Sequence, residues 1–374
     1  MTLQDRIRGS LIGGAAGDAL GYTVEFMGER AIFREYEGGI QAYEPSPLTG
    51  LAVISDDTQM TLFTAYAMLI KADRQLNRGI AAAPRCYANL TYQDWLLTQE
   101  LRYKEAAAKY DFSRPDDTDG VVSAPLMKLP ALYARRAPGL TCLSALEKRR
   151  RQRISNAAVN SFIADKVNNS KGCGGVMRVA PVGMLPFYDS AEKVAIEGAE
   201  CAAITHSHSL GYLPGAVLAE IIYRILFGDP SASLRDIVEQ ARDTTARIFA
   251  DDEHIDALTG IINEAIALSD NNERDLVNIH QLGEGWVGEE ALAIALYSCL
   301  KYPDDFSQAL IVSVNHKGDS DSTGAIAGNI LGAWIGYEAM EAKWKEKLEL
   351  SDEILEIADL LCEKANELRG SKEK

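Results

Sequence analysis

The sequence lacks paired cysteines, long uncharged apolar runs and an excess of basic charge, and each absence excludes a class of protein. Its six cysteines are widely spaced and form no Cys-x-x-Cys pair, which argues against a disulfide framework or a zinc site and favours reduced thiols. No stretch reaches the roughly 18 uncharged apolar residues of a membrane span. Arg6 and Arg8 precede small apolar residues, but Asp18 and frequent glycines disfavour a signal peptide. We therefore expect a cytoplasmic protein.

Acidic residues outnumber basic ones by 54 to 38, which gives a formal net charge of −16. This charge disfavours binding to nucleic acid or to an anionic membrane, so we expect neither as a partner. The one basic run, Lys148–Arg153, is typical of a solvated surface stretch. The composition, 47% hydrophobic and 25% charged, is that of an ordinary globular protein.

Apolar residues recur with a helical period along most of the chain. Helices are expected over 57–74, 190–206, 215–226, 234–249, 254–268, 288–301, 306–316 and 352–368. The ranges 40–54 and 111–126 are rich in Pro, Gly and Asp and are expected to be loops. No low-complexity linker divides the chain, so the sequence predicts one compact all-α domain over 1–368 and a frayed polar tail over 369–374. The segment 76–121 fits either a substrate-gating loop or surface decoration.

Two glycine ladders with a four-residue spacing lie near opposite ends of the sequence. The first consists of Gly9, Gly13, Gly17 and Gly21, and the second of Gly324, Gly328, Gly332 and Gly336. In a helix this spacing makes a smooth stripe along one face. Each interior glycine costs about 0.5–1 kcal/mol relative to alanine, so a compensating contact is needed. We expect at least one ladder to pack against another central helix; the alternative is that parts of these segments are loops.

Two acidic clusters each stand at the start of an expected helix. The first holds Ser55, Asp56 and Asp57, and the second holds Asp319, Asp321 and Ser322. Helix capping explains one or two of these residues. If the two helix starts meet, their oxygen ligands can hold a pair of divalent cations, which would remove the repulsion among the carboxylates. Carboxylates and hydroxyls without nearby Cys or paired His suit Mg²⁺ or Mn²⁺ rather than Zn²⁺. Thr323 is a rival to Ser322 as the hydroxyl ligand.

Six segments together resemble the ADP-ribosylglycohydrolase family. They are "GDALG" followed by Glu25, "SDDTQM", "GCGGVMRVAPVG", "THSHSLGY", "GEGWVGEEALAIALY" and "GDSDSTGAIAGN", and they span Gly13 to about Gly336 in the family's order. The resemblance implies a compact multi-helix fold with a dinuclear magnesium or manganese centre in a central cleft. It places the metal ligands on Ser55, Asp56 and Asp57 and on Asp319, Asp321 and Ser322.

The resemblance further implies cleavage of the N-glycosidic bond between ADP-ribose and a protein side chain, with arginine preferred. Glu25 matches a mobile glutamate of the family and is the candidate acid or proton relay, whereas Asp57 or Asp321 would orient the attacking water. The expected substrate-binding residues are Gly172, Gly174, Gly175, His206 and Trp286. The three glycines would bind the diphosphate through backbone N–H groups. Trp286 would either stack on the ligand or pack in the core.

Two other functions stay open at this point. One keeps the metals and takes a free metabolite such as O-acetyl-ADP-ribose as substrate. The other is an immunity-type binding protein that neutralises an ADP-ribosylating toxin by blocking it. The expected partner is therefore an ADP-ribosylated protein, or else such a toxin or its target. The intact set of acidic residues favours an enzyme, because a protein that only blocks a toxin has no need of them.

Overall fold

The protein is mostly helical in the part of the chain that the computed structural model describes, which is residues 1–79, 82–113, 120–151 and 160–372. Within those ranges there is no strand, and isolated bridges join Ala52 to Leu348 and Gly172 to Val287. The all-α prediction is therefore confirmed. The α-helices are α1 (Leu3–Tyr22), α2 (Glu29–Glu35), α3 (Asp56–Arg78), α4 (Pro84–Glu100), α5 (Tyr103–Lys109), α6 (Ala124–Met127), α7 (Leu140–Arg151), α8 (Ala191–Ala203), α9 (Ser209–Phe227), α10 (Leu234–Ile248), α11 (Ile255–Ser269), α12 (Asp275–Leu282), α13 (Gly288–Lys301), α14 (Phe306–Val314), α15 (Ser320–Ile335), α16 (Ala342–Lys345) and α17 (Ser351–Lys372).

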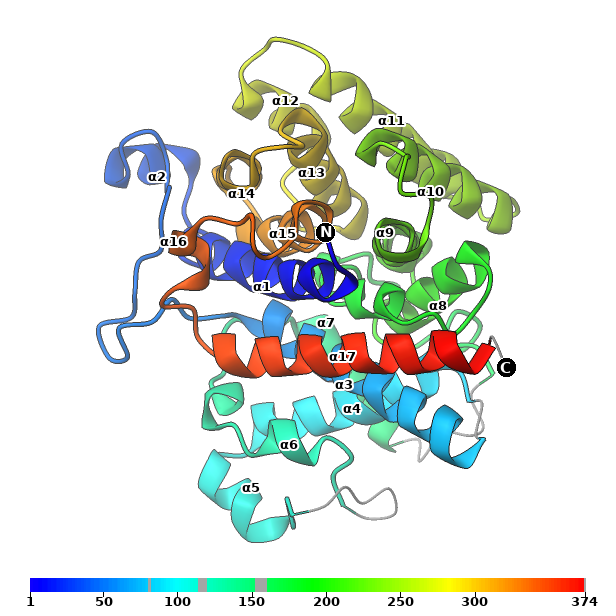
Figure 1. Cartoon of the computed structure of the whole chain (residues 1–374). Helices are drawn as coiled ribbons and strands as arrows, with labels where there is room; N and C mark the ends of the chain where they lie inside the picture. Colours follow the sequence, from blue (N-terminus) through cyan, green and yellow to red (C-terminus); the bar gives the residue numbers. More distant parts are fainter. Residues whose placement is uncertain (80–81, 114–119, 152–159, 373–374) are drawn as a thin grey trace.

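Helices α1 and α15 form an antiparallel pair at the centre of the molecule (Figure 1). A Cβ on Gly13 would lie 2.3 Å from the carbonyl oxygen of Gly328, and a Cβ on Gly328 would lie 1.9 Å from the carbonyl oxygen of Gly13. Only glycine leaves room for backbones this close. The predicted packing of a ladder against a central helix is confirmed, and the two ladders in fact pack on each other. Gly336 departs from the pattern because it ends α15 with a φ of +88°.

Helix α3 begins after the N-cap residue Ser55 and ends at Gly79. The Ser55 hydroxyl accepts a hydrogen bond from the backbone N–H of Asp57, and Gly79 closes the helix in the left-handed conformation. Helix α17 lies against both α1 and α3 (Figure 1). The end of α1 meets the starts of α3 and α15, because Asp18 accepts a hydrogen bond from the N–H of Ser55 and a Cβ on Gly21 would lie 2.1 Å from the carbonyl oxygen of Ser320.

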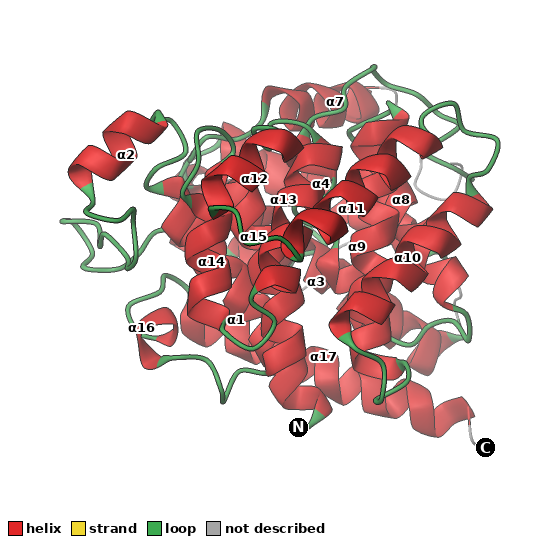
Figure 2. Ribbon diagram, turned by 90° about the horizontal axis from the view of Figure 1, so that it is seen from above, coloured by secondary structure: helices red, strands yellow, loops and turns green. Residues whose placement is uncertain are grey.

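The remaining helices surround this centre, and α2 lies at the edge of the molecule in both views (Figure 2). Helix α9 is central among them and packs against α8, α10 and α13. By length and composition it would be able to cross a membrane, but 78% of its most apolar window is buried inside the protein. A buried core helix of a folded domain passes the same test.

Each of the eight segments expected to be helical contains a helix, with α9 starting earlier, at Ser209. The range 40–54 contains no helix, as predicted. The predicted loop over 111–126 ends at Ala124, where α6 begins, and its residues 114–119 lie outside the described ranges. The segment 76–121 is mainly helical, because it contains α4 and α5, and α4 carries core residues such as Trp95. Helix α17 continues to Lys372, so the expected polar tail is helical up to that residue.

The expectation of a solvated basic run needs correction at Arg149. This residue belongs to α7 and is buried, where its guanidinium pairs with Asp165 at 2.8 Å and lies over the ring of Phe162. The charge pattern alone did not predict this, because the arginine faces inward from a helix whose neighbouring arginines face outward. Residues 152 and 153 of the run lie outside the described ranges.

Candidate metal centre and active site

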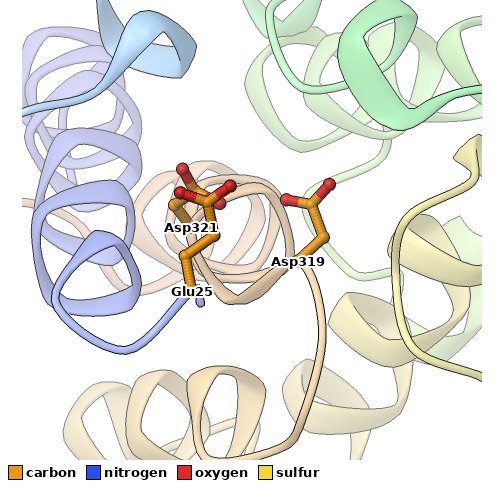
Figure 3. A group of neighbouring side chains, drawn as sticks. All are labelled: Glu25, Asp319 and Asp321. Atoms are coloured by element: carbon orange, nitrogen blue, oxygen red, sulfur yellow. The ribbon is translucent and has the colours of Figure 1, made fainter. Parts of the chain in front are cut away.

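The two acidic clusters and Glu25 lie around one pocket. Oxygen atoms of Glu25, Asp319 and Asp321 lie within 4.8 Å of one another, and Figure 3 shows these three carboxylates converging at the start of α15. Asp56 and Asp57, from the first turn of α3, line the same pocket. Residues far apart in the sequence therefore form a single carboxylate site where two helices begin.

The pocket has a volume of about 480 Å³, an acidic interior and an apolar mouth. Large apolar side chains are exposed at this mouth: Phe26, Leu140 and Trp286. Phe26 and Trp286 stack with 6.4 Å between ring centroids. Trp286 therefore does not pack in the core, and it is placed where a ligand entering the pocket would meet it.

Burial and mutual repulsion raise the pKa values of the carboxyls in this pocket. Burial first, then Asp319, raise the pKa of Glu25 to about 8. Burial also raises the pKa of Asp56 to about 8, although the N–H of Gly139 donates to its carboxylate at 3.3 Å. The pKa of Asp57 is raised well above its usual value by burial and by Asp56, and that of Asp321 by burial and by Asp57. Without cations, the cluster therefore retains protons at neutral pH.

Two carboxylate oxygens in this pocket have no partner among the described residues, namely Oδ2 of Asp57 and Oε2 of Glu25. Both side chains are buried, and an unpaired buried polar atom costs about 1–3 kcal/mol. A cation bound by Asp57 would satisfy its oxygen, and a proton or a ligand would satisfy that of Glu25. The unpaired donors are hard oxygens, which fits Mg²⁺ or Mn²⁺, although the thiols of Cys142 and Cys173 also line the pocket, contrary to the expectation of no nearby cysteine. The residues present therefore fit the metal centre that the sequence suggests.

Asp18 supports the site from behind the first turn of α3, and sequence reasoning missed it. It is fully buried in α1, and its carboxylate accepts hydrogen bonds from the N–H of Ser55 at 3.0 Å and of Thr58 at 3.0 Å. It also accepts one from the Thr58 hydroxyl at 2.5 Å. Burial raises the pKa of Asp18 to about 6. The only sequence signal was its place in "GDALG", since a charged residue inside a glycine ladder needs a buried partner.

The hydroxyl candidates occupy different positions. Ser322 lines the pocket. Thr323 instead donates to the carbonyl oxygen of Ser313 at 2.7 Å and does not line the pocket. Ser55 is also absent from the lining, and its hydroxyl accepts a hydrogen bond from the N–H of Asp57 at 3.2 Å. Of the three, only Ser322 therefore faces the space where cations would bind.

The glycine-rich loop is divided between the pocket and the core. Gly172 and Gly174 line the pocket. Gly175 packs against α9, where a Cβ would lie 2.3 Å from the carbonyl oxygen of Gly211, so it serves close packing. His206 lines the pocket next to the first two glycines, and burial followed by the charge of Arg178 lowers its pKa to about 3. Its imidazole is therefore neutral at physiological pH.

Two cysteines in the pocket wall were also missed by sequence reasoning. The thiol of Cys173 donates to Oδ2 of Asp319 at 2.6 Å, and burial followed by Asp319 raises its pKa well above the usual value. Cys142 lines the same pocket from α7. Widely spaced single cysteines carry no pattern that would place them together.

Comparisons with known proteins identify relatives of this chain. A family model described as ADP-ribosylglycohydrolase matches residues 1–370. The chain is 24% identical over 363 residues to the ADP-ribosyl-[dinitrogen reductase] glycohydrolase of Rhodospirillum rubrum, covering 94% of this chain and 93% of that protein. It is 26% identical over 217 residues to the ADP-ribosylhydrolase ARH3 of Gallus gallus, covering 52% of this chain and 58% of that protein.

A solved structure described as an ADP-ribosylglycohydrolase-related protein complex has the same fold. It superposes with a TM-score of 0.61 at 22% identity, covering 97% of this chain and 99% of the other. At this level of identity the likeness concerns the fold alone.

Proposed function

The chain belongs to the ADP-ribosylglycohydrolase family. We propose that it is a metal-dependent hydrolase that cleaves the N-glycosidic bond between ADP-ribose and a protein side chain, and that arginine is the preferred side chain. One observation carries the proposal: the carboxylates of two helix starts and of Glu25 converge in one pocket with unpaired buried oxygens. A protein that only binds ADP-ribose has no need to bear the electrostatic cost of this arrangement.

We assign the cations to the carboxylates of Asp56, Asp57, Asp319 and Asp321 and to the hydroxyl of Ser322, with Ser55 supporting them as the cap of α3. Two Mg²⁺ or Mn²⁺ ions bound there would polarise the ribose hydroxyls and lower the pKa of a water molecule. The pKa values raised by crowding are consistent with this assignment, because bound cations remove the repulsion that raises them.

The reaction needs one proton donor and one acceptor. The bond from the ribose anomeric carbon to the guanidine nitrogen breaks, the water oxygen bonds to that carbon, and the nitrogen takes up a proton. We assign the proton donor to Glu25, because its carboxyl lines the pocket and burial, the largest cause of its raised pKa, remains when cations are bound. Asp57 or Asp321 then orients the water and takes its proton.

The rest of the pocket suits the remainder of the ligand. The loop at Gly172 and Gly174 offers backbone N–H groups to the diphosphate, and His206 offers a neutral imidazole beside it. Trp286 at the mouth offers an exposed ring for stacking.

The test is release of ADP-ribose from an arginine-modified protein in the presence of Mg²⁺ or Mn²⁺. We expect chelator and Asp56→Asn to abolish release. Asp94→Asn is the matched control, because burial also raises the pKa of Asp94, to about 7, but this residue lies outside the pocket. Turnover that is insensitive to chelator and to Asp56→Asn would refute the metal mechanism.

The same assay separates the other candidate functions. O-acetyl-ADP-ribose and serine-linked ADP-ribose serve as competing substrates, and faster cleavage of either would change the substrate assignment. In a toxin-protection assay, equal protection by wild type and by Asp56→Asn would favour a blocking protein over an enzyme.

A further inference from the structure

A buried arginine without an acidic partner lies behind the candidate active site. Arg178 has no exposed surface, and its guanidinium lies over the ring of Tyr92, 4.5 Å from the centroid. Among the described residues no carboxylate pairs with it. Its Nη2 donates to the Thr205 hydroxyl at 2.6 Å and to the carbonyl oxygen of Cys201 at 3.4 Å. Burying an arginine costs several kcal/mol unless its charge is compensated, so a role for this charge is expected.

The contacts of Arg178 lead to His206 through one hydroxyl. Thr205 Oγ1 accepts from Arg178 and lies 2.8 Å from Nδ1 of His206. This oxygen accepts from a guanidinium, and its own proton can be donated to Nδ1 or to the sulfur of Cys142. A proton on Nδ1 would instead face the positive charge, which is unfavourable. The arrangement therefore favours the neutral tautomer of His206 with its proton on Nε2.

The Nε2 atom of His206 is directed to the part of the pocket where Gly172 and Gly174 lie. A Cβ added to either glycine would lie 3.4 Å from Nε2. No described residue accepts a hydrogen bond from this nitrogen, although its ring is almost entirely buried. A ligand oxygen in the pocket would be the natural acceptor.

We propose that Arg178 is a positioning residue, which acts through Thr205 to hold His206 as the Nε2–H tautomer and so presents a fixed neutral donor to an oxygen of the bound ligand. The nature of the ligand, a nucleoside diphosphate sugar, rests on the proposed function; the tautomer does not. A neutral donor in a fixed orientation binds oxygen without adding a cation next to the metal site.

The tautomer can be read directly from long-range proton–nitrogen correlations of protein labelled with ¹⁵N-histidine. The chain has five histidines, and the His206 signals are identified by their loss in His206→Gln. We expect a protonated Nε2 and an unprotonated Nδ1 in the wild type at pH 7. In Arg178→Met and Thr205→Val we expect the Nδ1–H form to appear, and in Thr205→Ser the wild-type pattern to return.

Binding of ADP-ribose by calorimetry gives the second readout, in the full chain with Mn²⁺. We expect Thr205→Val to weaken binding about three- to tenfold, the effect of one lost neutral hydrogen bond. Thr245→Val is the matched control, because Thr245 is fully buried and its hydroxyl has no partner among the described residues. Thr205→Val keeps the test usable if Arg178→Met does not fold.

A wild-type His206 protonated on Nδ1 would overturn the proposal. So would a Thr205→Val variant whose His206 signals and ADP-ribose affinity match those of Thr245→Val. Neither measurement involves hydrolysis. A chain that shows the expected tautomer but cleaves no ADP-ribosyl bond would refute the proposed function and leave this inference intact.

Discussion

Gly17 in α1 and Gly324 in α15 face each other so closely that a Cβ on Gly17 would lie 1.9 Å from the carbonyl oxygen of Gly324. Because that oxygen belongs to the backbone, no side-chain movement can relieve the overlap. We expect Gly17→Ala to destabilise the protein by roughly 3 kcal/mol or more, as measured by urea denaturation.

The control for this change is Gly260→Ala in α11. A Cβ at Gly260 would meet nothing within 4 Å, so the substitution should stabilise the protein by about 0.5–1 kcal/mol. Equal effects of the two substitutions would contradict the close packing of α1 on α15.

Asp57→Asn should separate stability from cation binding. The Oδ2 atom of Asp57 is buried and has no partner among the described residues, and burial followed by Asp56 raises the pKa of this residue. At pH 8.5 without metal we expect the variant to be more stable than wild type, on the order of 1 kcal/mol, because folding of the wild type must either bind a proton or bury a further negative charge there, and asparagine requires neither. Calorimetry should show that it has lost one Mn²⁺ site. A less stable variant would argue that the cluster is not strained.

Stability of the metal-free protein should fall as the pH rises from about 6 to 8.5. The pKa values of Glu25 and Asp56 are raised from 4.5 and 3.8 to about 8, so between about pH 4 and pH 8 the folded state binds more protons than the unfolded chain. The free energy of unfolding then decreases with pH in that interval. Melting temperatures in chelator across this range test the sign, and a rise would contradict it.

Cation affinity should show the opposite trend. Binding of Mn²⁺ displaces protons from these carboxyls, so the apparent affinity should increase about tenfold per pH unit for each proton released, until the pH passes about 8. Calorimetry in buffers with different ionisation enthalpies counts the protons. Binding without proton release would show that the carboxyls are already ionised.

Asp18→Asn should weaken cation binding although Asp18 does not line the pocket. An asparagine side chain has one acceptor oxygen where the aspartate has two, so it cannot accept the hydrogen bonds from both Ser55 and Thr58 in the same way. The first turn of α3 is therefore held less firmly. We expect roughly tenfold weaker Mn²⁺ binding, equivalent to about 1.4 kcal/mol. The same substitution at Asp94 should leave Mn²⁺ binding unchanged, and equal effects would remove Asp18 from this role.

The sequence predicted those parts of the fold and site whose pattern is local. Glycines four residues apart indicate a smooth helix face. Asp56 and Asp57, which directly follow Ser55 in the sequence, indicate the start of a helix that carries negative charge. Both features occur in the structure. The resemblance of six segments to one family indicated that both acidic clusters belong to the same site.

The residues that were missed depend on contacts between distant parts of the chain. Asp18 looks like an interruption of a glycine ladder until Ser55 and Thr58 are placed beside it. Which hydroxyl faces the pocket, that of Ser322 or that of Thr323, depends on the rotation of α15 about its axis. In the structure Ser322 lines the pocket, whereas Thr323 is turned away and donates to the carbonyl oxygen of Ser313. The burial of Arg149 and of Arg178 likewise depends on which helix faces pack together, and a charge pattern does not contain that information.

The pairing of α1 with α15 has a consequence for synthesis. Helix α1 is synthesised long before α15, the helix whose glycine face it packs against. Until α15 is made, the nascent chain carries an unmatched helix face, and its acidic cluster lacks Asp319 and Asp321. A cation site that needs the starts of both α3 and α15 can form only after α15 has been made, so chains that stop before it should be catalytically silent.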